Sequence, residues 1–107
     1  MLSSEAKKVL YALYCEYKAR RAVGISKMDA RFFRSAKSIQ EDFLQDMPTS
    51  DVEDALRELD DSDFMENFYA DGTIYTCNLT NEAISTIENL PKDILLNVLD
   101  FVSKFIP

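Results

Sequence analysis

The stretch that most constrains the fold of this chain runs from residue 48 to residue 80, where a helix pattern is followed by a hairpin pattern. Ser50 and Glu53 have the spacing of a capping box, in which each side chain bonds a backbone amide of the first turn. Pro48 prevents the preceding helix from continuing. Apolar residues then recur at spacings of three and four, at Val52, Ala55, Leu56 and Leu59. We therefore expect a helix over residues 50–61 with this face buried.

The opposite face of the same helix carries one cation among six carboxylates. These residues are Asp51, Glu53, Asp54, Arg57, Glu58, Asp60 and Asp61. The predicted helix is therefore strongly acidic on its solvent side.

A β-hairpin closed by Asp71 and Gly72 is predicted after this helix. Asp-Gly tolerates the positive φ angles of a type I′ turn, and aromatic and β-branched residues flank it. A two-residue loop pairs Ala70 with Thr73 and fixes the register. The expected facing pairs are Phe68 with Tyr75, Glu66 with Cys77, and Phe64 with Leu79. This register leaves a mostly apolar face, with Asn67, Thr76 and Asn78 on the solvent side.

The rest of the chain reads as helices around this unit. Residues 1–22 predict a first helix capped by Ser3 or Ser4, with a left-handed stop at Gly24. Residues 25–37 form a basic insertion in which Met28, Phe32 and Phe33 anchor one or two helical turns. A capping box from Ser38 to Glu41 opens a short helix that ends at Met47. The residues expected on the apolar faces are Ala6, Val9, Leu10, Leu13 and Tyr17, then Ile39, Phe43, Leu44 and Met47.

Residues 80–106 predict two C-terminal helices, the first capped by Thr80 and the second starting near Pro91. The second has an apolar face too wide for a lone surface helix. Either it packs on the first helix within the monomer, or it forms a homodimer seam with a second copy. The seam residues would be Leu95, Val98, Val102 and Phe105.

The predicted class is therefore a single, mostly α domain with a small β-hairpin wing (α+β). The chain resembles the winged helix-turn-helix superfamily with an extra C-terminal helix. The resemblance lies in the order of a helix, a capped helix pair and a hairpin, and in the Leu79-Thr80 step that leads from the hairpin into the next helix. The chain is also similar to small winged-helix proteins of Gram-positive bacteria and their mobile elements. The resemblance implies DNA binding, with the 50–61 helix in the major groove and the hairpin along the backbone. The carboxylates on that helix depart from the pattern, because an acidic face repels phosphate.

The charge is divided unevenly along the chain. Residues 1–37 hold nine Lys or Arg against three Asp or Glu, whereas residues 38–107 hold three against sixteen. A DNA-binding regulator would therefore use the basic segment and the few polar residues of the helix pair. The candidate DNA contacts are Lys27, Arg31, Arg34, Lys37, Thr49, Ser50 and Arg57. Internal neutralisation of the two charge groups is the alternative explanation.

A second hypothesis is an acidic protein-interaction module that docks a basic partner or imitates nucleic acid. Its contacts would be Asp51, Asp54, Glu58 and Asp61, all expected to be exposed. The two hypotheses differ in which surface meets the partner.

The chain lacks the residues that several kinds of catalytic and phosphate-binding site require. The chain has no histidine and only two glycines, which removes imidazole bases and glycine-rich phosphate loops. Asp60, Asp61 and Asp63 do not match a calcium loop, so no metal or cofactor is expected. Cys15 and Cys77 read as small buried thiols. We expect no catalytic residues, no membrane segment and a cytoplasmic protein.

Overall fold

A computed structural model describes residues 2–103, with side chains described as far as residue 97. The elements in chain order are α1 (Ser4–Ala22), α2 (Lys27–Ala30), β1 (Phe32–Phe33), α3 (Ala36–Phe43), α4 (Thr49–Asp61), β2 (Met65–Ala70), β3 (Thr73–Leu79), α5 (Asn81–Glu88) and α6 (Lys92–Ser103). Helices joined to one small antiparallel sheet confirm the predicted α+β class.

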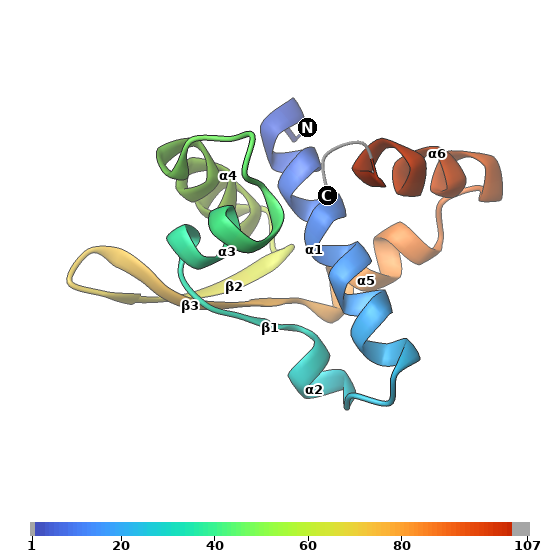
Figure 1. Cartoon of the computed structure of the whole chain (residues 1–107), viewed down its shortest axis with the longest axis horizontal. Helices are drawn as coiled ribbons and strands as arrows, with labels where there is room; N and C mark the ends of the chain where they lie inside the picture. The colour runs from blue at the N-terminus through green and yellow to red at the C-terminus, as the bar shows by residue number, and fades with distance from the viewer. Residues whose placement is uncertain (1, 104–107) are drawn as a thin grey trace.

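The sheet has the strand order β1-β3-β2, with both pairings antiparallel. Figure 1 shows α3 and α4 on one side of the hairpin, and no described helix lies against its other side. The hairpin part of the sheet therefore has one face packed on helices and one open face.

The core lies between α4, α1, α3 and the packed face of the sheet. The predicted apolar face of α4 is at most 2% exposed and contacts α1, α3 and β2. All five residues predicted on the apolar face of α1 are buried as well. Fully burying one side chain the size of leucine contributes roughly 1.5–3 kcal/mol, so this junction supplies much of the stability.

The start and end of α1 are as predicted. Ser3 caps the helix by accepting a hydrogen bond from the Ala6 amide at 3.1 Å. Gly24 follows the helix with a φ of 89°, a left-handed conformation that glycine adopts at little cost.

Two predicted capping boxes are wrong. Ser35, not Ser38, caps α3, because its hydroxyl accepts the Ser38 amide at 3.2 Å and starts the helix at Ala36. α3 then ends at Phe43 rather than at Met47. In α4 the cap residue is Pro48, with no side-chain capping bond from Ser50.

The hairpin turn is confirmed, since both Asp71 and Gly72 have positive φ angles, and Ala70 pairs with Thr73. The register beyond it is wrong by one residue. Tyr69 pairs with Ile74 and Phe68 with Thr76, which leaves Tyr75 as an extra residue in a β-bulge.

The bulge shifts the remaining pairs and changes the faces. Glu66 pairs with Asn78 rather than Cys77, and Met65 rather than Phe64 pairs with Leu79. The packed face of the hairpin buries Met65, Ile74, Cys77 and Leu79. Phe68 and Tyr75 are exposed instead of buried.

Residues 25–37 form α2, β1 and the first two residues of α3. One helical turn occurs as expected, but Met28 does not anchor it, because its side chain is exposed. Phe32 and Phe33 lie in a strand that pairs with β3, and only Phe33 is buried.

At the C-terminus, Thr80 caps α5 through the Ala83 amide as predicted. α6 begins at Lys92 and packs on α1. Of the predicted dimer seam, Leu95 is half-buried against the core. The side chains of Val98 and Val102, and the whole of Phe105, lie outside the described residues.

Ser35 directly precedes α3, and Ser50 lies in the first turn of α4, so the two serines give a matched stability test. Ser35→Ala should lower the free energy of unfolding by about 1 kcal/mol, because it removes a real N-cap. Ser50→Ala should stay within about 0.5 kcal/mol of wild type, because Ser50 caps nothing. Urea unfolding measures both; a larger loss at Ser50 than at Ser35 would contradict the observed helix starts.

Candidate binding surfaces

The solvent face of α4 is acidic, as the sequence predicts. Asp51, Asp54 and Asp61 are exposed. Glu53 and Glu58 are half-buried because each has an internal partner. The acidic face therefore has fewer unpaired carboxylates than the sequence alone suggests.

Arg57, the cation of this face, is used inside the molecule. Its Nη2 donates to Glu53 Oε1 at 2.9 Å and to the Gly72 carbonyl at 2.8 Å. Its guanidinium carbon lies 5.0 Å from the centre of the Tyr69 ring. The hydrogen bond to Glu53 raises the pKa of Arg57 above its ordinary value. Arg57 therefore ties α4 to the hairpin, and its side chain remains 41% exposed.

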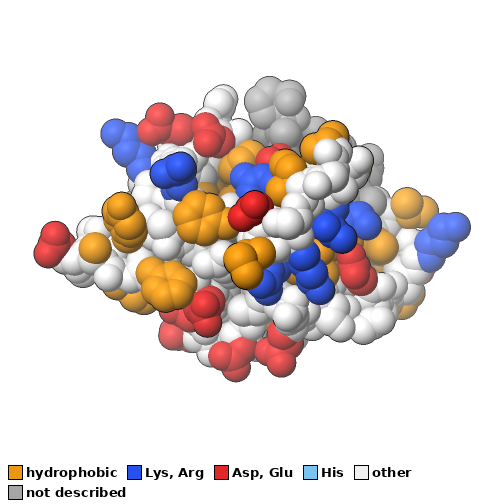
Figure 2. All heavy atoms as spheres, turned by 90° about the horizontal axis from the view of Figure 1, so that it is seen from below, with side chains coloured by type: hydrophobic (Ala, Val, Ile, Leu, Met, Phe, Trp, Pro, Cys, Tyr) orange, Lys and Arg blue, Asp and Glu red, His pale blue; other side chains and the backbone are white. Residues whose placement is uncertain are grey.

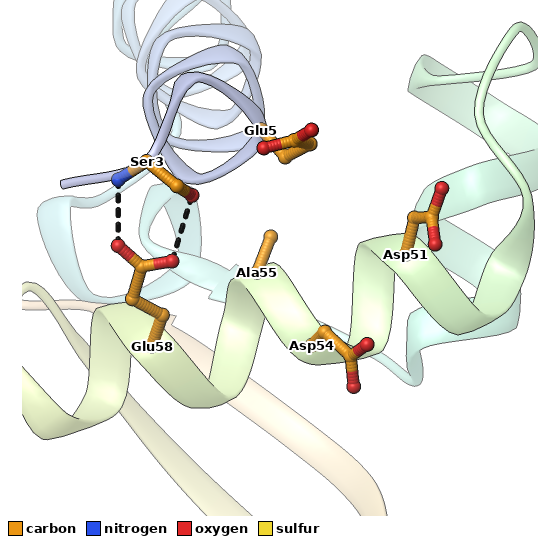
Figure 3. A pocket seen from close by; sticks show the side chains of 6 residues that line it. All are labelled: Ser3, Glu5, Asp51, Asp54, Ala55 and Glu58. Atoms are coloured by element: carbon orange, nitrogen blue, oxygen red, sulfur yellow. Dashed lines mark hydrogen bonds between the residues drawn. The ribbon is translucent and has the colours of Figure 1, made fainter.

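A groove of about 300 Å³ lies between the start of α1 and α4. It is lined by Ser3, Glu5, Asp51, Asp54, Ala55 and Glu58. Figure 3 shows that the Glu5 carboxylate comes from α1, whereas the other three acidic side chains come from α4. We call this site the acidic groove; its lining contains carboxylates and no cation.

Glu58 has a structural role in this groove, which corrects the expectation that it is free for a partner. The Ser3 amide donates to Glu58 Oε2 and the Ser3 hydroxyl donates to Oε1, both at 2.7 Å. These two hydrogen bonds lower the pKa of Glu58. Glu58 therefore fastens the start of α1 to α4, and Asp51, Asp54 and Glu5 remain available.

The candidate DNA contacts in the basic segment differ in exposure and in their neighbours. Lys27 is exposed on α2, whereas Arg31 is half-buried and donates to Asn81 Oδ1 at 3.3 Å. Arg34 and Lys37 are exposed but line two different hollows.

Each of those hollows is also lined by at least one carboxylate. Arg34 shares its hollow with Asp29 and Asp42. Lys37 shares the other with Thr49 and Glu53. Ser50 is exposed at the start of α4, outside both.

Internal neutralisation accounts for part of the charge division. Lys8 of α1 pairs with Asp46, and Lys18 lies 4.0 Å from Glu88 of α5. These contacts join the basic third of the chain to the acidic remainder. Among the described residues, no salt bridge involves the residues that line the acidic groove, and none involves Lys27, Arg34 or Lys37.

Arg20 has a role that the sequence did not reveal. Its Nη1 donates to the Phe32 carbonyl at 2.6 Å, and its guanidinium carbon lies 4.5 Å from the centre of the Phe33 ring. Arg20 therefore caps the open edge of the sheet at β1. Only its position near the end of α1 was visible in the sequence, where it reads as a partner for the helix dipole.

Three exposed aromatic side chains occupy the open side of the sheet, one from each strand. Phe32 is 39% exposed, Phe68 53% and Tyr75 69%. Figure 2 shows this side of the molecule, with apolar rings gathered over the hairpin and charged groups beside them. This surface was not predicted from the sequence, because the predicted register buried Phe68 and Tyr75.

Both thiols of the chain lie within the described residues. Cys15 is half-buried and Cys77 is buried, and they form no disulfide. Burial raises the pKa of Cys77 to about 12, so this thiol is protonated at neutral pH. Among the described residues, no cluster of His, Cys, Asp or Glu has the geometry to hold a metal ion.

No family model, curated protein or solved structure matches this chain. Across residues 2–103, no helix has both the length and the apolar character needed to cross a bilayer.

The Ser3–Glu58 contact predicts a specific pH dependence. A carboxyl whose pKa is lowered by folding stabilises the folded state fully above its ordinary pKa of 4.5, and this contribution is lost as the pH falls through the lower folded-state pKa. The difference in unfolding free energy between wild type and Glu58→Gln should therefore be constant near neutral pH and shrink in acid. Urea unfolding at several pH values measures it.

Ser3→Ala provides the control for that measurement, because it removes the hydroxyl donor and leaves the amide donor in place. The coupling energy between Ser3→Ala and Glu58→Gln should also fall in acid. A difference that persists unchanged in strong acid would show that the Glu58 charge is not responsible.

Proposed function

We propose that this chain is a winged-helix domain that binds a basic protein segment through the acidic groove between α1 and α4. The winged-helix assignment is supported by the order α1, β1, α3, α4, β2, β3 and by the sheet order β1-β3-β2. The turn between α3 and α4 joins the helix pair expected from the resemblance. A fold alone does not define a function, so the ligand is argued from the site.

The observation that carries the proposal is the lining of the acidic groove. The carboxylates of Glu5, Asp51 and Asp54 have no hydrogen bond or salt bridge among the described residues, and these three residues line a concave space of about 300 Å³. Each of these carboxylates adds negative potential to the same groove, and that potential attracts an ammonium or guanidinium group. The groove is therefore suited to a lysine or arginine side chain.

The same geometry argues against duplex DNA at α4. Duplex binding depends on cations that neutralise phosphates. Arg57 is engaged with Glu53 and Gly72, and the groove adds carboxylates beside it. A negatively charged α4 would instead speed the encounter with a basic partner.

The test uses a short, labelled, arginine-rich peptide and measures its binding by fluorescence anisotropy at low salt. Wild type should bind it, and a glutamate-rich peptide of the same length should not bind. The double variant Asp51→Asn/Asp54→Asn should weaken binding about tenfold, since each exposed ion pair contributes up to about 1 kcal/mol.

A matched control variant removes the same number of negative charges at positions outside the groove. Asp61→Asn/Asp71→Asn removes two exposed carboxylates that do not line the groove. This variant should bind the peptide nearly as well as wild type. Equal weakening by both double variants would show that only net charge matters and would contradict a groove-specific site.

Duplex DNA binding through the basic segment is the second candidate function. It is favoured by one observation: Lys27, Arg34 and Lys37 are exposed and make no salt bridge among the described residues. Thr49 and Ser50 are also exposed at the start of α4. Arg31 and Arg57 are less suited, because both already have internal partners.

Binding of random duplex DNA at low salt tests this candidate. If the basic segment contacts phosphate, affinity should fall steeply as salt is raised, and Lys27→Glu/Arg34→Glu/Lys37→Glu should abolish binding. Binding that survives the triple substitution would remove the basic segment as the contact surface. Arg31 is left intact so that the fold is not disturbed.

A further inference from the structure

We propose that the open face of the sheet binds single-stranded nucleic acid, with bases stacked on Phe32, Phe68 and Tyr75. We call these three residues the aromatic face. The inference concerns a surface on the side of the sheet away from α3 and α4, so it goes beyond the proposed role of the acidic groove. It rests on three features of the structure: the placement of the rings, the hollow beside them and the polar groups between them.

The first feature is that each strand contributes one ring to the same side. The bulge in β3 turns Tyr75 outward, while Ile74 and Cys77 on either side remain buried. Neighbouring strands lie about 4.8 Å apart, so three strands spread the rings over about 10 Å. That width suits two or three unstacked bases, because sheets that bind single strands use exposed aromatics as stacking platforms.

The second feature is a hollow of about 200 Å³ at the β1 edge of the sheet, which borders the open face at Phe32. Arg34 and Asp29 also line it, and its other wall is α3, with Asp42 and Phe43. A guanidinium supplies only donors and carboxylates supply only acceptors, so the hollow offers both. A nucleobase edge also carries both donors and acceptors, whereas a phosphate diester carries only acceptors. The hollow at this edge therefore fits a base better than it fits a bare anion.

The third feature is the polar side chains between the rings. Asn78 pairs with Phe32 on one side and Glu66 on the other, and Thr76 pairs with Phe68. Asn78 and Thr76 are neutral groups that donate and accept hydrogen bonds. Glu66 is exposed and places a negative charge at the β2 side of the face.

This charge distribution separates the proposal from ordinary phosphate binding. Glu66 on the face and the two carboxylates that share the hollow with Arg34 outnumber its positive charge, so most of the affinity must come from stacking. Binding should therefore depend weakly on salt, whereas phosphate contacts give a steep dependence. A duplex is unsuitable because its bases remain stacked inside the helix.

The experiment measures fluorescence anisotropy of a labelled oligothymidylate and of a labelled oligouridylate with the full chain. Wild type should bind at least one of them with a shallow salt dependence, and an unlabelled duplex should compete poorly. Phe68→Ser and Tyr75→Ser should each weaken binding about tenfold, the scale of one lost base–aromatic stack. Glu66→Gln should strengthen binding a few-fold, because it removes repulsion from the phosphates.

Leu96→Ser is the matched control. Leu96 is also a large exposed apolar residue, but it lies on α6, which packs on α1 away from the hairpin. This variant should bind the oligonucleotides like wild type. Circular dichroism confirms that each variant is folded, which is expected because the substituted side chains are exposed.

Three results would overturn the proposal. The first is no binding of either oligonucleotide at low salt. The second is binding that Phe68→Ser and Tyr75→Ser leave unchanged. The third is a dimer in sedimentation that these two substitutions convert to monomer without any effect on nucleic acid, which would identify the face as an interface between two copies.

Discussion

The burial of the apolar face of α4 is the constraint on which the rest of the structure depends. This face lies at the junction of α1, α3 and β2, and its four apolar side chains are almost completely inaccessible. Once those side chains are buried, the rotation of α4 about its axis is fixed. The carboxylates on its other side must then face solvent beside the start of α1. The acidic groove is therefore a direct consequence of how the core is packed.

The same packing gives the molecule two chemically different sides. Helices α3 and α4 cover one face of the sheet, while the opposite face remains open (Figure 1). Arginines secure the arrangement, since Arg20 covers the β1 edge and Arg57 joins α4 to the hairpin turn. Both were visible in the sequence as surface cations. Their use inside the fold leaves the acidic groove and the aromatic face as the surfaces with a distinctive composition.

The sequence predicted the features that depend on local chemistry. The hairpin turn follows from Asp71 and Gly72, and the buried face of α4 follows from apolar spacing. The predictions were wrong where tertiary contacts decide between local alternatives. Ser35 and Ser38 could each begin the same helix, and the bulge at Tyr75 has no sequence signal of its own. That single extra residue exposed two rings expected in the core. The Ser3–Glu58 contact was equally unpredictable, because it joins residues 55 apart in the chain.

The most direct test of the central claim is to map the binding site residue by residue. Amide chemical shifts of the ¹⁵N-labelled chain would be followed during titration with the arginine-rich peptide. The account predicts shifts concentrated at the start of α1 and along α4, around Glu5, Asp51 and Asp54. Shifts concentrated at Lys37, Thr49 and Thr73 instead, or no saturable shifts at all, would contradict the assignment of the acidic groove as the docking site.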